Sequence, residues 1–445
     1  MKKRALCAGI LVAALVIAAA PCLLNAQVIQ GLTLEKLGIL GTQGAGARPY
    51  GMGFAYTAVS DDAFALLFNP AGLADVRRRE LTLGLRQRSS ELTNSYGVTE
   101  ASKTASSTCL DHIAVVYPYP TFRGSLVLAA GVFAVGSSDL ESVKNATLYD
   151  IPADVQNIYI QSGTIYQYHF GLGVDISPEI AAGLSLVIWD ESVDFTDEID
   201  YADADSQAVW RDDVSMDLDG FSINMGLMFK ASDAVRIGLS ASSPTWLSYE
   251  GDGITTYEGT YASGGGWTTD DQTGIIDEEY TLPMRFNGGA AVRLASLTFA
   301  ADASFCDYSQ AKYNGLVISD ELDPARSDVF DAVWSFHVGA ELTLPQAPIR
   351  FRGGFSYVPL ELSTVEEVAY IADDTPTSRI ASFDMNEERM RLSFGAGALI
   401  DKVLQLDLAV SFGGYEKVTH GASGAVLFAE KKDDTEIVLS GGYRF

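Results

Sequence analysis

The side chains that most often catalyse reactions or bind metals are sparse in this sequence. Its 445 residues include 4 His, and His112, His169, His337 and His420 lie far apart, without a His-Glu-x-x-His motif or a Cys-x-x-Cys pair. Asp111 directly precedes His112, a pairing that some hydrolases use to activate a nucleophile. No other feature of the sequence supports catalysis. We therefore predict that the protein is not an enzyme and needs neither a metal nor another cofactor.

Charge and cysteine content exclude further classes of protein. The chain has 30 Lys+Arg and 58 Asp+Glu, a formal net charge of −28, whereas a nucleic-acid-binding protein needs a cationic surface. Beyond the N-terminal segment only Cys109 and Cys306 remain, either as one disulfide or, as we prefer, as two separate thiols. Gly51 and Gly53 are not followed by the Lys-Ser/Thr pair of a phosphate loop, so we expect them to allow tight turns and close backbone approach.

The first 26 residues have the pattern of a secretory signal peptide. Met1–Arg4 is basic, Leu6–Pro21 is apolar, and a plausible cleavage site follows, ending at Ala26. The apolar run is short for a membrane-spanning helix. The proline before Cys22 fits a lipoprotein site poorly. We predict that the protein is exported and that residues 1–26 are removed.

Most of the remaining chain alternates polar and apolar residues, as β-strands with one apolar face do. Over 404–412 every even position is large and apolar, and every odd position is polar or small. We count 14 such segments, which start near residues 80, 111, 124, 164, 183, 216, 235, 280, 297, 333, 349, 390, 404 and 434. Short turns alternate with long acidic connections at 89–110, 136–163, 192–213, 247–279, 307–332, 358–389 and 415–433.

This layout predicts an all-β fold, a 14-stranded antiparallel transmembrane β-barrel in the outer membrane of a Gram-negative-type envelope. Because an open sheet edge is forbidden in lipid, the first strand should pair with the last. The final strand ends at Phe445 with alternating apolar residues, which resembles the signal by which outer-membrane barrels engage the barrel assembly machinery. The alternative is a soluble exported β protein.

The segment before the first strand, 27–79, does not alternate and is rich in Gly and Ala. Its distinctive residues are Arg48, Gly51, Gly53, Asp61, Asp62, Asn69, Pro70, Ala71 and Gly72. This pattern resembles the N-terminal hatch of the FadL-type outer-membrane transporters of long-chain fatty acids and other hydrophobic compounds. The resemblance implies a periplasmic hatch at 27–79 that plugs a barrel formed by 80–445. Secretion-associated relatives share the same hatch, so the motif specifies the fold better than the cargo.

The resemblance also implies that a hydrophobic ligand leaves sideways, through a kinked gap in the wall near strand 3. The segment 126–134 is apolar on both faces, which suits a lipid conduit better than a water-filled pore. Val127 and Phe133 should face the lumen, and Gly131 is a candidate for a kink or bulge. The alternative is that these residues pack tightly against the hatch.

Arginines collect at positions that should face the lumen. They are Arg86, Arg236, Arg285, Arg293, Arg350, Arg352, Arg391 and Arg444. We favour their pairing with lumen acids, among them Asp302, Glu341, Asp407 and Glu436, or with acids of the hatch, because buried charges persist only when paired. The alternative is that Arg285 and Arg350 hold the carboxylate of a ligand.

Aromatic residues, including Tyr257, Tyr261 and Trp267, lie in the predicted loop 247–279. They would form either a capture groove for ligand or part of the outer aromatic girdle.

The function we predict from the sequence is passive transport of hydrophobic molecules such as long-chain fatty acids, in contact with outer-membrane lipid. Outer loops would capture the ligand, the hatch would gate it, and it would leave near strand 3. The alternative is a FadL-like barrel that acts as a partner in protein secretion or surface attachment. A general porin is disfavoured because the hatch would block its pore.

Overall fold

A computed structural model describes the structure of most of the chain. The described residues are 44–96, 99–147, 154–202, 206–261, 265–268, 272–314, 316–317, 332–359, 365–369, 379–384, 388–420 and 426–445. The predicted signal peptide and the first part of the predicted hatch lie outside them.

The structure confirms the predicted all-β, 14-stranded antiparallel barrel. Eleven wall positions are single strands: β1 (Glu80–Tyr96), β2 (Thr99–Tyr119), β5 (Asp154–Asp175), β6 (Ile180–Ala202), β7 (Ser206–Lys230), β13 (Leu297–Asp307), β16 (Ala332–Thr343), β17 (Ile349–Pro359), β20 (Glu388–Ile400), β21 (Leu404–His420) and β22 (Val426–Arg444). Three positions are strands interrupted once: β3 (Leu126–Ser137) with β4 (Leu140–Thr147), β8 (Val235–Ser242) with β9 (Thr245–Tyr261), and β11 (Gln272–Leu282) with β12 (Arg285–Leu294).

Two of these interruptions fall at prolines. Pro244 separates β8 from β9, and Pro283 separates β11 from β12. Proline has no backbone N–H to donate to a ladder, so strands break there. Short pieces lie beside the wall: β10 (Gly266–Thr268), η2 (Tyr308–Gln310), β14 (Lys312–Tyr313), β15 (Leu316–Val317), β18 (Val365–Ala369) and β19 (Arg379–Asp384).

The wall closes as expected, because β1 pairs with both β2 and β22. The pairs with β22 run from Glu80 and Arg444 to Tyr96 and Phe428. Strand alternation also matches the sequence. Leu406 and Leu408 on β21 are about half exposed on the outer face, whereas the intervening Asp407 is 4% exposed inside.

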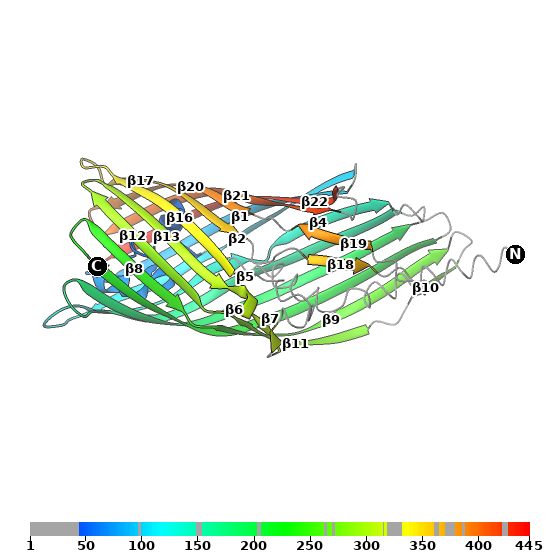
Figure 1. Cartoon of the computed structure of the whole chain (residues 1–445), viewed down its shortest axis with the longest axis horizontal. Coiled ribbons are helices and arrows are strands. Elements are labelled where there is room, and N and C mark those ends of the chain that lie inside the picture. The colour runs from blue at the N-terminus through cyan, green and yellow to red at the C-terminus, as the bar shows by residue number, and fades with distance from the viewer. Residues whose placement is uncertain are drawn as a thin grey trace.

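The strands are much longer than the alternation predicted. The segments 89–110, 192–213 and 247–279, expected to be loops, are largely strand: β1 continues to Tyr96, and β6 continues to Ala202. The upper limit of the apolar outer belt is marked by Phe221 and Trp246, whose rings stack with centroids 6.4 Å apart. Above it the outer positions of the strands are polar, as at Asp190 and Asp194 of β6, while apolar side chains such as Val193 point inward. The outward apolar face that marks a lipid-facing strand therefore disappears, although the backbone ladder continues. Figure 1 shows β6, β7 and β9 extending well beyond β16 and β17.

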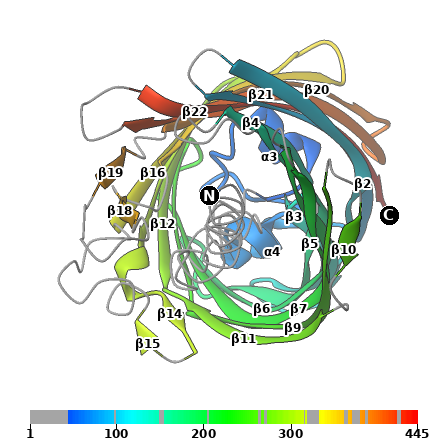
Figure 2. The same ribbon diagram turned by 90° about the vertical axis from the view of Figure 1, so that its right-hand side faces the viewer.

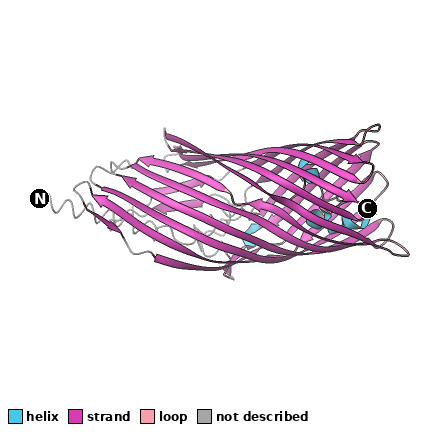
Figure 3. Cartoon of the chain, turned by 180° about the vertical axis from the view of Figure 1, so that it is seen from behind, coloured by secondary structure: helices cyan, strands magenta, loops and turns pink. Residues whose placement is uncertain are grey.

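Within the described ranges the barrel encloses three short helices; Figure 2 labels α3 and α4 inside the ring, and Figure 3 shows helices near the C-terminal end. They are α3 (Ala47–Gly51), α4 (Ala65–Phe68) and η1 (Pro70–Asp75). Almost every side chain from Ala45 to Ala74 is buried. We call residues 44–79 the hatch from here on. No helix in the described ranges is long and apolar enough to cross a membrane.

Candidate functional site

Arg48 of the hatch is the centre of a buried ion network. Its Nη1 bonds to Asp62 Oδ2 at 3.0 Å and to Asp61 Oδ1 at 2.5 Å, so it orders the turn that precedes α4. Its Nε bonds to Glu341 Oε2 of β16 at 3.1 Å. One guanidinium therefore ties the hatch to itself and to the barrel wall.

The network continues along the wall through Arg352 of β17. Arg352 Nε lies 2.7 Å from Glu341 Oε2, and Arg352 Nη1 lies 2.6 Å from Asp407 Oδ1 of β21. Glu341 thus sits between two guanidinium groups, one from the hatch and one from the wall. All these side chains except Asp61 are buried, so each charge depends on its partners.

The same arrangement fixes the ionisation of the hatch residues. Burial alone raises the pKa of Asp61, but the adjacent Arg48 guanidinium outweighs it and holds the pKa below its ordinary value. Burial likewise lowers the pKa of Arg48, and the surrounding carboxylates Asp61 and Glu341 more than reverse that, so the pKa is raised. Arg48 and Asp61 are therefore both charged at neutral pH.

Two further wall carboxylates bind the backbone of the hatch. Asp302 Oδ2 on β13 accepts hydrogen bonds from the backbone N–H groups of Tyr56 and Thr57, each at 2.7 Å. Asp111 Oδ2 on β2 accepts one from Gly46 N at 2.8 Å. Hatch donors that have no helical partner are satisfied in this way. Sequence analysis expected Asp302 to pair with an arginine, but it binds N–H groups instead.

The Asn69-Pro70-Ala71-Gly72 motif starts η1 and attaches it to the wall. Asn69 Oδ1 accepts from Ala71 N at 3.2 Å, a helix N-cap, and Pro70 occupies the first helical turn, where no donor is needed. Asn69 Nδ2 donates to Leu227 O of β7 at 3.1 Å. Gly72 has no room for a Cβ, which would lie 2.2 Å from Ser60 O.

A set of inward-facing wall glycines lets the hatch backbone rest directly on the barrel backbone. A Cβ would lie 2.2 Å from Pro70 C at Gly183, 2.0 Å from Asn69 Oδ1 at Gly226, 2.3 Å from Thr57 O at Gly238, 2.3 Å from Met52 O at Gly339 and 2.1 Å from Gly53 N at Gly354. We call these five the glycine belt. The glycine belt was not predicted from the sequence, although glycines at lumen-facing positions of separate strands would have been the signal.

Strand 3 lines the hatch side of the lumen. Val127 and Phe133 point inward, as predicted, and both are fully buried. The centroid of the Phe133 ring lies 6.2 Å from the ring centroid of Phe64 in the hatch and 5.5 Å from that of His169. Their surroundings thus match the alternative of packing against the hatch.

Gly131 is not a kink. It continues the ladder opposite Ala114 of β2, and the irregularity in β3 falls later, between Ala134 and Gly136. A Cβ at Gly131 would lie 2.6 Å from the Ala114 Cβ and 2.8 Å from the Phe133 ring. The glycine is therefore needed to make room for Phe133.

Beyond Phe133 the chain separates from β2 but stays paired with β5. The β2–β3 ladder ends at the pair His112 and Phe133, and β4 pairs with β5 alone. Lumen-facing side chains of β1 take over as partners: Arg86 Nη2 donates to Ala134 O at 2.8 Å, Arg88 Nη1 to Ser137 O at 3.0 Å, and Asn94 Nδ2 to Val143 O at 3.0 Å. β4 consequently lies on the inner side of β1 and β2 (Figure 2).

The Asp111-His112 pair serves this architecture. A bulge opposite Gly84 and Leu85 turns both side chains inward, where both are 0% exposed. His112 Nδ1 lies 2.7 Å from Asp111 Oδ2, and Asp111 Oδ1 accepts from Arg86 Nε at 2.8 Å. A pair so enclosed, with the carboxylate occupied by Arg86 and the hatch backbone, fits a structural role.

The lumen arginines are mostly paired, as favoured from the sequence. The pairs are Arg86–Asp111, Arg236–Asp75, Arg352–Glu341, Arg391–Glu436 and Arg444–Glu80. Arg285 donates to Tyr308 Oη at 3.0 Å, and Arg293 is exposed. Arg350 is partly buried, and no ion pair joins it to another residue in the described ranges.

The aromatic residues expected in the loop 247–279 lie on strands instead. Tyr249 of β9 is buried and packs edge to face against Tyr280 of β11, which directly follows that segment, with ring centroids 5.9 Å apart. Tyr257 is partly buried on β9. The side chains of Tyr261 and Trp267 lie outside the described residues.

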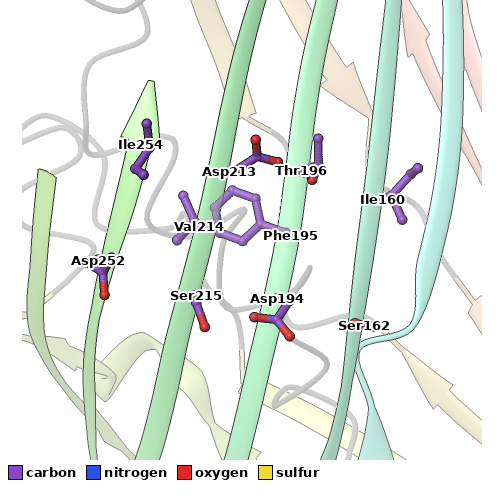
Figure 4. Close-up of a pocket in the computed structure, with 10 residues that line it drawn as sticks. All are labelled: Ile160, Ser162, Asp194, Phe195, Thr196, Asp213, Val214, Ser215, Asp252 and Ile254. Atoms are coloured by element: carbon purple, nitrogen blue, oxygen red, sulfur yellow. Dashed lines mark hydrogen bonds between the residues drawn. The ribbon is translucent and has the colours of Figure 1, made fainter. Parts of the chain in front are cut away.

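A groove of about 430 Å³ lies on the outer face of the barrel, where β5, β6, β7 and β9 extend beyond the apolar belt (Figure 4). Its outward-facing lining residues come from β5, β6, β7 and β9: Ile160, Ser162, Asp194, Thr196, Asp213, Ser215, Asp252 and Ile254. Phe195 and Val214 lie between them and pack toward the lumen core. We call this the acidic groove.

Comparisons with known proteins support the fold. The sequence model of a family described as BamG matches residues 42–343. No curated protein matches the sequence. The Pseudomonas putida toluene transporter TodX is 14% identical with a TM-score of 0.63, covering 91% of this chain and 99% of that one. A Pseudomonas aeruginosa FadL homologue is 14% identical with a TM-score of 0.60, covering 92% and 100%. The Ralstonia pickettii toluene transporter TbuX is 16% identical with a TM-score of 0.58, covering 91% and 99%.

Proposed function

This chain belongs to the BamG family, and on that premise we propose that it acts as an outer-membrane barrel subunit in the assembly or secretion of proteins. The family name links it to the barrel assembly machinery. The alternative predicted from the sequence was a partner in protein secretion or surface attachment. We now prefer that kind of role, extended to barrel assembly, over passive lipid transport.

The observation that carries this proposal is the attachment of the hatch. Arg48 and Glu341 join it to the wall by buried charges, and the glycine belt places backbone on backbone. Removing one partner of a buried ion pair costs roughly 3–5 kcal/mol, because the other charge is left without full compensation. A hatch attached in this way should stay in place, which favours a structural role for the barrel over a channel whose hatch moves to let a ligand pass.

The test is deletion of the protein from its native host. We expect a fall in the amount of folded outer-membrane barrel proteins, measured by the shift in gel mobility that heat causes in folded barrels. Re-expression of the wild-type chain should restore them. Unchanged barrel assembly, with a loss of hydrophobic-compound uptake, would contradict the proposal.

Passage of hydrophobic compounds is the second candidate, favoured by the apolar interior. Phe64, Val127 and Phe133 belong to one buried cluster that joins hatch and wall, and the structures similar in fold include two toluene transporters. The test is mass spectrometry of small molecules retained by the detergent-purified barrel, with competition by a fluorescent fatty acid. Retained lipid that the probe displaces would favour this candidate, and an empty barrel that does not bind the probe would eliminate it.

A further inference from the structure

The edge of β2 above the apolar belt has no ladder partner in the described part of the chain. From Thr99 to Leu110 the strand pairs with β1 on one side only, and its pairing with β3 begins at His112. A strand in this position presents a row of N–H and C=O groups to whatever lies beside it. Within lipid such an edge would be forbidden, but here it lies beyond the belt, level with polar outer residues such as Gln87 and Ser89.

The structure keeps this edge open. The strand that would cover it, β4, is held inside by Asn94, which donates both to Val143 O and to Ser142 Oγ. Arg88 holds the preceding turn in the same way through Ser137 O. Asn94 is 3% exposed, so this tether is part of the core.

The edge also carries few of the features that usually prevent unwanted pairing. Natural edge strands carry prolines, several charges or inward-pointing charges. Residues 99–110 are mainly Ser, Thr and Ala, with Glu100 and Lys103 as the only charged residues and no proline. Small side chains leave the backbone accessible to a second strand.

A short series of contacts through β4 and β5 connects this edge to the acidic groove. Asn94 is paired with Ala101 of β2 and contacts Ser142 of β4, and the neighbouring Glu141 is paired with Ile160 of β5, which lines the groove. The groove presents Asp194 and Asp252, together with Asp213, which already pairs with Arg211, and its two isoleucines are exposed.

Like charges also face each other just below the groove. Asp190 of β6 is directly opposite Asp219 of β7, and Asp217 of β7 is opposite Glu250 of β9. Directly opposed like charges destabilise a sheet, and a cationic partner would relieve that repulsion.

We propose that the β2 edge from Thr99 to Leu110 binds an extended segment of a second protein as an added β-strand, with Lys or Arg side chains of that segment reaching the acidic groove. Main-chain hydrogen bonds supply the affinity, and the charged and apolar groove selects the side chains. This inference rests on the proposed function, because it names the surface through which the barrel would engage a protein partner.

Other occupants fit less well. No group of three or more His, Cys, Asp or Glu side chains in the described ranges is arranged to hold a metal ion. The groove would repel an anionic lipid headgroup. A headgroup also has no row of alternating donors and acceptors to pair with the β2 edge. An extended basic polypeptide satisfies both surfaces.

The experiment uses the detergent-purified full-length barrel and a labelled synthetic peptide of alternating Lys and Val. A photoreactive benzoylphenylalanine is placed at Ser106 on β2 or at Ser89 on β1. The two positions are paired and both face outward, but the backbone at Ser89 is laddered on both sides. We expect the peptide to cross-link at Ser106 and not at Ser89.

Two matched changes test the mode of binding. A peptide N-methylated along one edge keeps its charges but loses backbone donors, and we expect at least about tenfold weaker binding. The triple variant D194N/D213N/D252N should weaken binding and reduce its dependence on salt. Equal cross-linking at both positions, or unchanged binding of the N-methylated peptide, would overturn the proposal. The proposal would also be overturned if the triple variant bound the peptide normally and changed only the Mg²⁺-dependent binding of anionic lipid vesicles.

Failure here is distinguishable from failure of the proposed function. If the peptide does not cross-link at Ser106 while deletion of the protein still impairs barrel assembly, only the β2 edge is excluded. If deletion of the protein leaves barrel assembly unchanged, the proposed function is wrong, whether or not the peptide cross-links at Ser106.

Discussion

Arg352 and Glu341 lie opposite each other on β17 and β16 and form a buried ion pair with an Nε–Oε2 distance of 2.7 Å. The same oxygen, Glu341 Oε2, also accepts a hydrogen bond from Arg48 Nε of the hatch. One carboxylate therefore pairs with an arginine of the wall and with an arginine of the hatch. The attachment of the hatch therefore depends on a residue far from it in sequence.

Replacing Glu341 with Gln should destabilise the protein by roughly 3 kcal/mol, because two buried guanidinium groups lose their shared anion. Urea unfolding in lipid vesicles measures the free energy of unfolding. The matched control is Arg211→Gln, since Arg211 and Asp213 form an exposed pair worth less than about 1 kcal/mol. Equal effects of the two changes would contradict a central role for the network.

Gly354→Ala should expel part of the hatch, because the new Cβ would lie 2.1 Å from Gly53 N. We expect a loss of about 1–3 kcal/mol and faster proteolysis within the hatch. Gly353→Ala is the control on the same strand, where a Cβ would meet nothing within 4 Å. Comparable hatch proteolysis in both variants would argue against backbone-on-backbone packing.

The hatch should loosen in acid. The pKa of Asp61 is lowered in the folded protein, so its contribution to stability is present above the unfolded pKa of about 4. It is lost as pH falls through the lower folded pKa. Proteolysis of the hatch between pH 7 and pH 3, corrected for protease activity, measures the change. The Asp61→Asn variant should show a smaller pH dependence, and an unchanged profile would exclude this group as the cause.

Phe133→Ala should cost about 3–5 kcal/mol, because the ring is fully buried between hatch and wall. The thermal unfolding temperature of the purified barrel measures the loss. Phe394→Ala is a suitable control, since that ring is 52% exposed on the outer face. A large gain in fatty-acid binding by the Phe133 variant, with little loss of stability, would instead favour a ligand path along strand 3.

Sequence patterns predicted the parts of this structure that a lipid boundary enforces. Alternation identified the wall because Leu406 faces lipid while Asp407 faces the lumen, and the motif from Arg48 to Gly72 identified the hatch. Strand lengths beyond the belt were not predictable from hydropathy, since Asp190 and Asp219 face water on strands that continue unbroken. The glycine belt and the diversion of β4 were missed because each depends on which distant backbones meet, information that no local pattern contains.

The seam between β1 and β22 has a consequence for the order of events during folding. The hatch immediately precedes β1 and lies inside a ring that this seam closes. Its backbone rests on strands β6, β7, β8, β16 and β17, which are all made after it. Once the ring is sealed, the hatch could enter only through an open end of the barrel and would have to fit between walls that are already fixed. We therefore expect the hatch to dock before the seam closes or together with it.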